Sequence, residues 1–583
     1  MNRSVAVVAL LCIGLTCLVG CRDNLESGAD LILVNGRVYT LSWGEPAADG
    51  SIAFDAPHDE SGWQPDAEAV AVKDGRILFV GTSDEIEIHQ GGATQTIDVH
   101  GATVLPGFVD SHAHIQELGR ERVQVNLVGV ETEEEAIDRV AASSDGTPDG
   151  QWIVGWGWDE GEWANRYPTA DKLSERFPDN PVMLRSLHGF AVWGNRMALA
   201  EAGIDRQTPE PDGGRILRDS AGNPTGILID RATTLLTAAV PEPTDEQLEG
   251  FILTGLETMA RDGYVAVHQA GADSRIMHAF ERLEADGRLP VRVYAMLSLR
   301  DEALCREWIE RGPYTSSTML TARSVKAYYD AALGSRGARM LEDYSDRPGH
   351  RGVSGTNYGF DFELAAEMMQ AGFQIGVHAI GDAGNRETLD FLESVIAGNP
   401  EIMAQRHRIE HAQVVHPDDI GRFAPAGIIA AMQPPHCVED MSWAEDRVGP
   451  ERGKGAYAWR TLRKAGVHLT FSADLAGSDH DVFYGLHSAV TRRDKNFHPP
   501  GGWYPEESMS PEEAVRGYTN WSAYAAGWED RTGVLQPGKW ADITVVNIDP
   551  LVVGETDPGR LLDGRVLATI VGGSLVYNSL PQR

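Results

Sequence analysis

Two histidines separated by a single residue, His112 and His114, follow an apolar run from Ala102 to Val109. Successive residues of a β-strand point to opposite faces, so the two imidazoles point the same way. A strand that ends in two same-facing imidazoles presents two neutral nitrogen ligands to one cation. A pair of surface or core histidines would show the same spacing, so this motif alone leaves both interpretations open.

Further polar side chains lie at or near the ends of other predicted apolar strands, namely Lys326, His378, His411 and Asp474. Buried together without partners, these groups would cost several kcal/mol, whereas metal ligation satisfies them. The alternatives are hydrogen-bonded core histidines and a salt-bridged lysine. The complete set favours a metal centre.

The middle of the chain alternates short apolar strands with helical stretches, a pattern typical of βα units around a parallel sheet. The predicted strands are Val104–Asp110, Tyr264–Gln269, Val291–Leu297, Ser324–Tyr328, Phe373–His378, Arg408–Ala412, Ile428–Met432 and His468–Ala473. Eight βα units close into a TIM barrel, whose active site lies at the C-terminal ends of the strands. The long interval between the first two strands, about 117–249, predicts an inserted subdomain beside the barrel mouth.

Hairpin patterns at both ends of the chain predict one small β-sandwich domain built from the two termini. Asp74-Gly75 marks a turn near the N-terminus, and Gly572-Gly573 marks one near the C-terminus. The fold class predicted is therefore α/β, a (β/α)8 TIM barrel with an inserted subdomain and a β-sandwich domain. The predicted boundaries are a signal peptide over 1–20, the N-terminal β part over 21–103, the barrel over 104–532 and the C-terminal β part over 533–583.

The first residues predict export from the cytoplasm. Arg3 is followed by the apolar run Val5–Val19, which is too short to be read as a membrane span. Leu18–Cys21 resembles the lipobox of bacterial lipoproteins, in which the cysteine is lipidated, with an ordinary secretory peptide as the alternative. Because Arg22 follows the cysteine, this resemblance implies an outer-membrane anchor that faces the periplasm of the cell envelope, or otherwise a secreted protein.

Composition excludes several other functions. The 583-residue chain has 86 acidic and 50 basic residues, a formal charge of −36, which argues against nucleic-acid binding and against a membrane anchor that acts through charge. Of its five cysteines only Cys305 and Cys437 follow position 21, so there is no disulfide framework. No phosphate-binding glycine loop and no serine nucleophile elbow is present.

The chain resembles the amidohydrolase superfamily, specifically the metal-dependent hydrolases of the amidohydrolase-3, YtcJ-like group. Besides the motifs above, the resemblance rests on Asp212–Ile216, Asn223–Gly226, Asp330–Arg336, Gln433–His436 and Leu535–Asp542. It extends over nearly the whole mature chain. These motifs are specific for the family and not for a substrate.

The resemblance assigns a role to each predicted ligand. It implies that His112 and His114 bind the more buried metal and that a carboxylated Lys326 bridges to a second metal. His378 and His411 would bind that second ion, and Asp474 would contact the first metal and the nucleophilic water. An uncarboxylated lysine would repel metals, so the second site depends on this modification.

The activity implied is hydrolysis of a non-peptide carbon–nitrogen bond of amide type. A metal polarises the carbonyl and lowers the pKa of its water from about 15.7 toward about 7, and Asp474 transfers the proton. Zinc suits the imidazole-rich set best, as one or two ions, with iron and manganese as alternatives. An ester, lactone or cyclic amide substrate, and a non-catalytic envelope binding lipoprotein, remain open alternatives. The partners expected are a small-molecule substrate, the membrane through the lipid anchor alone, and a second copy in a homodimer.

Four residues have two interpretations each. Asp479 also resembles the family's terminal aspartate, but Asp474 is preferred because it ends the apolar run. Arg336 is expected either to hold a substrate carboxylate or to form a structural ion pair. His436 is expected to reach the substrate or to be a solvated loop residue. Trp158 is expected to wall a substrate pocket or to pack against the barrel.

Overall fold

The computed structural model describes residues 28–159, 163, 167–187 and 190–581. The predicted signal peptide and Cys21 lie outside the described residues. Within the described ranges, no helix is long and apolar enough to cross a membrane.

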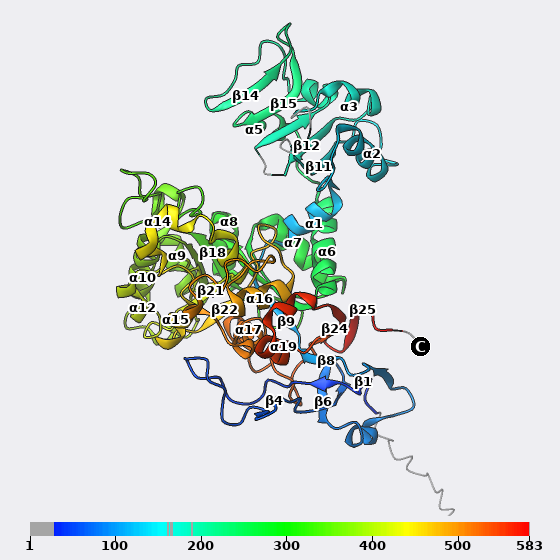
Figure 1. Cartoon of the computed structure of the whole chain (residues 1–583), viewed down its shortest axis with the longest axis vertical. Helices are drawn as coiled ribbons and strands as arrows, with labels where there is room; N and C mark the ends of the chain where they lie inside the picture. Colours follow the sequence, from blue (N-terminus) through cyan, green and yellow to red (C-terminus); the bar gives the residue numbers. More distant parts are fainter. Residues whose placement is uncertain (1–27, 160–162, 164–166, 188–189, 582–583) are drawn as a thin grey trace, which may run out of the picture.

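Eight parallel strands form the barrel that the sequence predicts (Figure 1). In sheet order they are β9 (Phe108–Ala113), β16 (Tyr264–Ala272), β17 (Arg292–Ser298), β18 (Leu320–Tyr328), β19 (Gln374–Ala379), β20 (Arg408–His411), β21 (Ile429–Met432) and β22 (Leu469–Phe471). A parallel bridge between Ala113 at the end of the first strand and Leu475, four residues after the end of the last strand, closes the barrel. The apolar sequences of these strands suit a parallel sheet that is buried on both faces.

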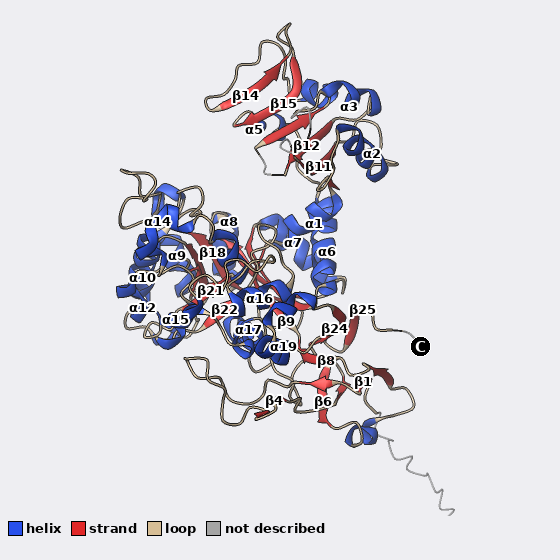
Figure 2. Ribbon diagram, viewed as in Figure 1, coloured by secondary structure: helices blue, strands red, loops and turns tan. Residues whose placement is uncertain are grey.

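Helices surround the barrel (Figure 2). The longer ones are α1 (Ile115–Val123), α6 (Asp245–Arg261), α7 (Ser274–Ala285), α8 (Glu302–Arg311), α9 (Phe362–Gln370), α10 (Asp382–Ile396), α14 (Ala444–Gly453) and α16 (Val482–Thr491). Shorter ones are α11 (Pro400–Met403), α12 (Pro417–Phe423), α13 (Pro434–Asp440), α15 (Trp459–Lys464), α17 (Pro511–Gly517), α18 (Asn520–Ala526) and α19 (Pro550–Thr556). Three 3₁₀ turns, η2 (Gly355–Tyr358), η3 (Pro505–Glu507) and η4 (Pro558–Asp563), complete this part of the chain.

Two glycines allow α1 and α6 to cross closely. A Cβ at Gly119 would lie 1.7 Å from the carbonyl oxygen of Phe251, and one at Gly255 would lie 2.3 Å from that of Ile115. Any larger residue at either position would push the helices apart. This crossing matters for the site because α1 begins directly after His114.

Both termini contribute to a β-sandwich. One sheet has the strand order β6 (Arg76–Gly81), β5 (Ala69–Lys73), β1 (Leu31–Val34) and β7 (Gln95–Asp98). The 3₁₀ turn η1 (Glu85–His89) packs beside β5 and β6. The other contains β2 (Arg37–Val38), β8 (Thr103–Pro106), β23 (Ile543–Val546), β24 (Val566–Val571) and β25 (Ser574–Asn578). Leu33 and Val70 of the first sheet share a core with Val104 and Ile543 of the second. A separate short hairpin consists of β3 (His58–Asp59) and β4 (Gly62–Trp63).

One predicted strand is divided between two domains. Val104 pairs with Val545 in the sandwich, whereas Phe108 begins the first barrel strand, so the expected strand Val104–Asp110 and the boundary at 104 are too early. Gly107 separates the two segments, and a Cβ there would lie 2.2 Å from the side chain of Val265. The chain therefore changes sheets at a position where only glycine fits.

The insertion folds as a separate layer that projects from the barrel beside α1 and α6 (Figure 1). Its six-stranded sheet has the order β10 (Val125–Asn126), β11 (Ile153–Trp158), β12 (Val182–Ser186), β13 (Ala191–Gly194), β15 (Pro224–Asp230) and β14 (Gly214–Arg218). Its helices are α2 (Glu133–Ser143), α3 (Ala170–Arg176), α4 (Arg196–Glu201) and α5 (Thr233–Thr237). The helices and strands of the insertion span residues 125–237, a shorter segment than the predicted 117–249. The difference arises because most of α1 and the start of α6 lie within the predicted range but belong to the barrel.

Candidate metal centre

The first and last barrel strands are tied together at the predicted site. The buried carboxylate of Asp110 accepts hydrogen bonds from the backbone amides of His112 (2.9 Å) and Ala473 (3.0 Å). The amide of Asp474 donates to the carbonyl of His112, and the amide of His114 donates to the carbonyl of Leu475. These bonds hold the two histidines against Asp474.

Asp474 lies among four imidazoles. Its Oδ1 is 3.2 Å from Nε2 of His114 and 3.6 Å from Nε2 of His112. Its Oδ2 is 3.9 Å from both Nδ1 of His411 and Nε2 of His436. Ligand atoms of His112, His411 and Asp474 all lie within 4.8 Å of one another, close enough for one cation to reach all three.

Hydrogen bonds at Nδ1 orient two of these rings. Nδ1 of His112 donates to Glu410 (2.5 Å), and Nδ1 of His411 donates to Oε1 of Gln433 (2.9 Å). Each ring therefore keeps an unprotonated Nε2, which is the metal-binding form of the side chain. In this structure Nε2 of His112 accepts a hydrogen bond from Nζ of Lys326 at 3.0 Å.

His378 lies beside this group. Its ring centroid is 4.4 Å from that of His411, and its buried Nε2 has no hydrogen-bond partner among the described residues. The nearest carboxylate, Asp330, is 3.7 Å away and accepts three backbone hydrogen bonds, from Arg339, Ile380 and Gly381. An orphaned, buried imidazole nitrogen is costly unless it binds something, so it fits a metal ligand.

The charges of the site suit a cation. Burial, with the nearby charge of Lys326, lowers the pKa of His112 to about 4, and burial also lowers the pKa values of His378 and His411, so these rings are neutral at neutral pH. Burial lowers the pKa of Lys326 to about 8. Although burial opposes ionisation of Asp474, the histidines around it, by their charge when protonated and by a hydrogen bond from His114, hold its pKa well below the usual value. Neutral nitrogen donors around one carboxylate match the ligand preference of a divalent transition metal.

Backbone strain is concentrated at the same place. His411 (φ 75°), Ala412 (φ 41°) and Asp474 (φ 57°) all have left-handed conformations that non-glycine residues rarely adopt. Such conformations persist where the surrounding structure over-determines them, and they occur often at functional sites. Here they direct His411 and Asp474 toward the shared centre.

The structure separates the remaining candidates. Asp479 lies in the loop that follows Asp474, and its carboxylate pairs with Lys495 rather than with the imidazoles of the site. Arg336 forms a two-bond ion pair with Asp346, at 2.9 and 2.6 Å, which is the structural alternative expected for it. His436 stacks over His411, with the rings 6.1 Å apart and 7° from parallel, and so belongs to the site.

The expectation that Trp158 walls a substrate pocket is wrong in this structure. Its side chain is fully buried in the core of the insertion against Trp163 and Trp193, and its indole nitrogen donates to the carbonyl of Leu184. Packing within its own sheet, rather than against the barrel, accounts for this residue.

Sequence reasoning missed the residues that support the ligands. Glu410 precedes His411 in the sequence and contacts His112 from across the barrel, and Arg408 forms an ion pair with that same glutamate. Asp110 and Gln433 were also missed. Arg408 and Glu410 could have been found in the sequence, because they are charged residues at alternate positions of a short predicted strand.

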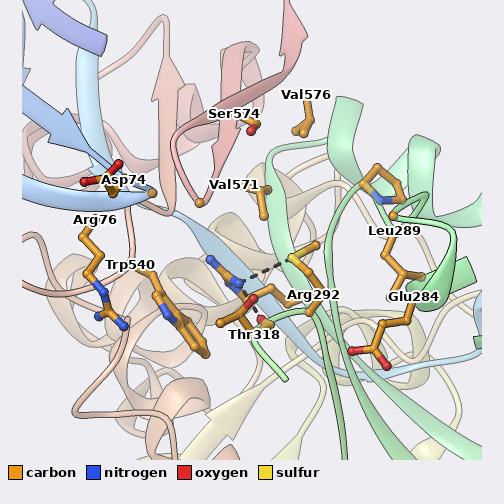
Figure 3. Close-up of a pocket in the computed structure, with 15 residues that line it drawn as sticks. Asp74, Arg76, Glu284, Leu289, Arg292, Thr318, Trp540, Val571, Ser574 and Val576 are labelled. Atoms are coloured by element: carbon orange, nitrogen blue, oxygen red, sulfur yellow. Dashed lines mark hydrogen bonds between the residues drawn. The ribbon is translucent and has the colours of Figure 1, made fainter. Parts of the chain in front are cut away.

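A cavity of about 370 Å³ lies at the opposite end of the barrel, between the start of β17 and the sandwich (Figure 3). Arg292 occupies its centre, with its guanidinium 4.0 Å from the ring centroid of Trp540. Asp542 already pairs with this arginine at 2.7 and 2.8 Å, and Thr318 accepts a further bond. The charge is internally satisfied, and the cavity is lined by none of the residues of the metal centre.

Comparisons with known proteins agree with this architecture. A family model described as "Amidohydrolase family" matches residues 95–577. The Bacillus subtilis protein YtcJ, whose name describes it as a candidate amidohydrolase, is 32% identical over 520 residues, which are 88% of this chain and 96% of YtcJ. An N-substituted formamide deformylase of Arthrobacter pascens is 27% identical over 530 residues, 88% of this chain and 95% of that protein. The solved structure of an uncharacterised metal-dependent hydrolase from Pyrococcus furiosus is 28% identical, covers 89% of this chain and 99% of its own, and superimposes with a TM-score of 0.71.

Proposed function

The chain belongs to the amidohydrolase family of metal-dependent hydrolases, and from that premise we propose that it hydrolyses a non-peptide carbon–nitrogen bond of amide type in a small molecule. The observation that carries the proposal is the position of Asp474. Its carboxylate lies 3.2 to 3.9 Å from nitrogens of four histidines that lie at, or just after, the C-terminal ends of barrel strands. This is where barrel enzymes place their active sites.

The residues divide into ligands and a proton carrier. We propose that His112, His114, His378 and His411 hold one or two metal ions, which Asp474 also contacts, with Lys326 joining them once its amine is carboxylated. When bound, a divalent metal lowers the pKa of its water from about 15.7 toward about 7 and polarises the scissile carbonyl. Zinc suits this nitrogen-rich set best.

Asp474 is suited to transfer the proton. Its low pKa keeps it ionised at neutral pH, so it can accept a proton from the attacking water. The same carboxylate then returns that proton to the leaving nitrogen, which must be protonated to depart as an amine. His436, stacked over His411 at the open side, is placed to contact the substrate.

An amide is favoured over an ester by the similarity to the formamide deformylase of Arthrobacter pascens. That protein is named for removing a formyl group from a substituted nitrogen. Similarity at 27% identity over nearly full length supports the same bond type and leaves the substituent undefined.

The test is metal removal and reconstitution of the purified protein. Metal analysis should find stoichiometric divalent metal, a chelator should abolish hydrolysis of a panel of formamides, amides and cyclic amides, and Zn²⁺ with bicarbonate should restore it. His112→Ala and His114→Ala should each lose bound metal. His407→Gln, at a buried histidine outside the ligand set, is the control and should retain it. Full activity without metal would refute the proposal, and turnover of esters alone would exclude the amide.

A further inference from the structure

A second charged group stands at the mouth of the barrel, beyond the metal centre. Arg300 is an exposed residue two positions after the end of β17. The amide of the preceding Leu299 donates to the carbonyl of Lys326 on the neighbouring strand, at 2.9 Å. The backbone therefore fixes Arg300 beside the strand end that carries Lys326.

Two tyrosines hold the guanidinium. Its central carbon lies 4.2 Å from the ring centroid of Tyr328 and 5.4 Å from that of Tyr358. The Tyr328 ring in turn lies 5.6 Å from the ring of His378 and 5.0 Å from Nζ of Lys326. One aromatic ring thus separates the guanidinium from two proposed metal ligands.

No carboxylate in the described part of the chain pairs with Arg300. Among the described residues, no hydrogen bond or ion pair reaches its guanidinium, whose contacts are the two tyrosine rings. Other arginines in the loops near this end of the barrel are paired: Arg336 with Asp346, and Arg339 with Glu387. In a chain with 86 acidic and 50 basic residues, carboxylate partners are abundant, so an unpaired arginine here is notable.

Two carboxylates also act on the Tyr328 ring that Arg300 contacts. Glu117 follows His114 on α1, and its buried Oε2 has no hydrogen-bond partner among the described residues. Its negative charge and that of Asp474 both act on Tyr328, as does the positive charge of Arg300. A negatively charged group that approaches Tyr328 is therefore repelled by Glu117 and Asp474 and attracted by Arg300.

We propose that Arg300 is a specificity-determining residue that binds a carboxylate of the substrate, so that the preferred substrates are amides bearing a carboxylate several bonds from the scissile nitrogen. A guanidinium presents two parallel N–H groups that match a carboxylate, and stacking on aromatic rings leaves its edge free to donate. This inference rests on the proposed amide hydrolysis, because it names the substrate class of the same site.

The test uses matched substrates. N-formyl ω-amino acids with one to four methylene groups are compared with their neutral methylamides on the metal-loaded enzyme. We expect wild type to prefer the carboxylate of at least one chain length by about 10²-fold in kcat/KM, as a site built for a charged hydrogen bond does. Arg300→Gln should remove this preference while leaving kcat/KM for the neutral methylamides nearly unchanged. Arg300→Lys, which keeps a positive charge, should retain part of the preference. Arg306→Gln, on α8 and paired with Glu302 and Glu367, is the matched control and should behave as wild type.

Binding provides a readout that needs no turnover. Calorimetric titration of the same compounds into the metal-loaded Asp474→Asn variant, with and without Arg300→Gln, measures the carboxylate preference directly. A carboxylate that binds only to the metal would bind both proteins equally and would overturn the inference. An equal loss for charged and neutral substrates in Arg300→Gln would do the same, since it would indicate a structural role. Arg300-dependent binding without any amide cleavage would support the inference while refuting the proposed reaction, and amide cleavage without a carboxylate preference would refute the inference alone.

Discussion

Nδ1 of His112 lies 2.5 Å from Oε2 of Glu410, and both side chains are essentially excluded from solvent. Glu410 is itself held by Arg408, whose guanidinium contacts it at 2.7 and 2.9 Å. Gly376 on the neighbouring strand leaves the necessary room, since a Cβ there would lie 2.6 Å from Oε1 of Glu410. The carboxylate therefore fixes the orientation and the protonated nitrogen of a ring that the metal needs.

Replacing this carboxylate should weaken metal binding. In Glu410→Gln the neutral amide no longer stabilises the N–H of His112, and we expect about 10–100-fold weaker binding of Zn²⁺. The change also leaves Arg408 buried without its counter-charge, which should lower stability. Competition with a chromophoric chelator measures the first effect, and thermal unfolding measures the second.

Glu513→Gln separates the two effects. Glu513 is also a buried glutamate paired with an arginine, Arg460, but it lies outside the metal site. Its loss should lower the unfolding temperature without changing the affinity for Zn²⁺. Equal metal affinity in wild type and Glu410→Gln would show that the contact with His112 is only structural.

Much of the barrel could be predicted from sequence because its strands are short apolar runs that end in polar residues. Lys326 and His378 were predicted inside their strands, and they lie in β18 and β19. The expected strand from Val104 was wrong because apolar residues continue across Gly107 into a different sheet. Hydrophobic pattern shows burial, but it does not show which neighbouring strand provides the burial.

The residues that orient the metal ligands, such as Glu410, could not be predicted from hydrophobic pattern in the same way. On a regular strand Glu410 and His411 would face opposite sides, yet both reach the centre because His411 has a positive φ. Trp158 looked like a pocket wall because its neighbours are aromatic, whereas its partners Trp163 and Trp193 come from other parts of the insertion. Both cases depend on contacts between segments distant in sequence.

A histidine outside the site should make stability depend on pH. Burial lowers the pKa of His468 to about 4, below its unfolded value of about 6.5. The unfolded chain therefore binds the proton first, so the stabilisation present above pH 6.5 is lost as pH falls toward 4. At pH 5 this amounts to about 2 kcal/mol. His468→Gln should show a smaller fall in unfolding temperature between pH 7 and pH 5 than wild type, and an identical fall would contradict the assignment.

The proposed envelope location rests on Cys21, and it can be tested by fractionation. If this cysteine is lipidated, Cys21→Ala should release the protein from the membrane fraction or leave an unprocessed precursor. One acyl chain binds membranes only marginally, so stable anchoring needs the several chains of a lipoprotein. Cys305→Ala, at a buried cysteine in the barrel, is the control and should stay with the membrane. A wild-type protein found wholly in the soluble periplasmic fraction would refute the anchor.

The last prediction concerns the two aspartates that follow the eighth strand. Asp474 lies among the imidazoles, while Asp479 pairs with Lys495 and accepts a hydrogen bond from the amide of Asp481. Asp474→Asn preserves the size of the side chain but cannot accept a proton from water. Loss of a positioned acid–base group costs about 10²–10⁴ in rate, so kcat should fall by that factor.

Metal content distinguishes a lost base from a lost ligand. Asp474→Asn should retain more metal than His112→Ala, because the four histidines remain and an amide oxygen can still approach the ion. Asp479→Asn should keep kcat near wild type, since the carboxylate it removes is engaged by Lys495. Kinetics and metal analysis of both variants under the same conditions decide between them. An inactive Asp479→Asn beside an active Asp474→Asn would transfer the catalytic role to Asp479, and would mean that the imidazoles surround Asp474 for metal binding alone.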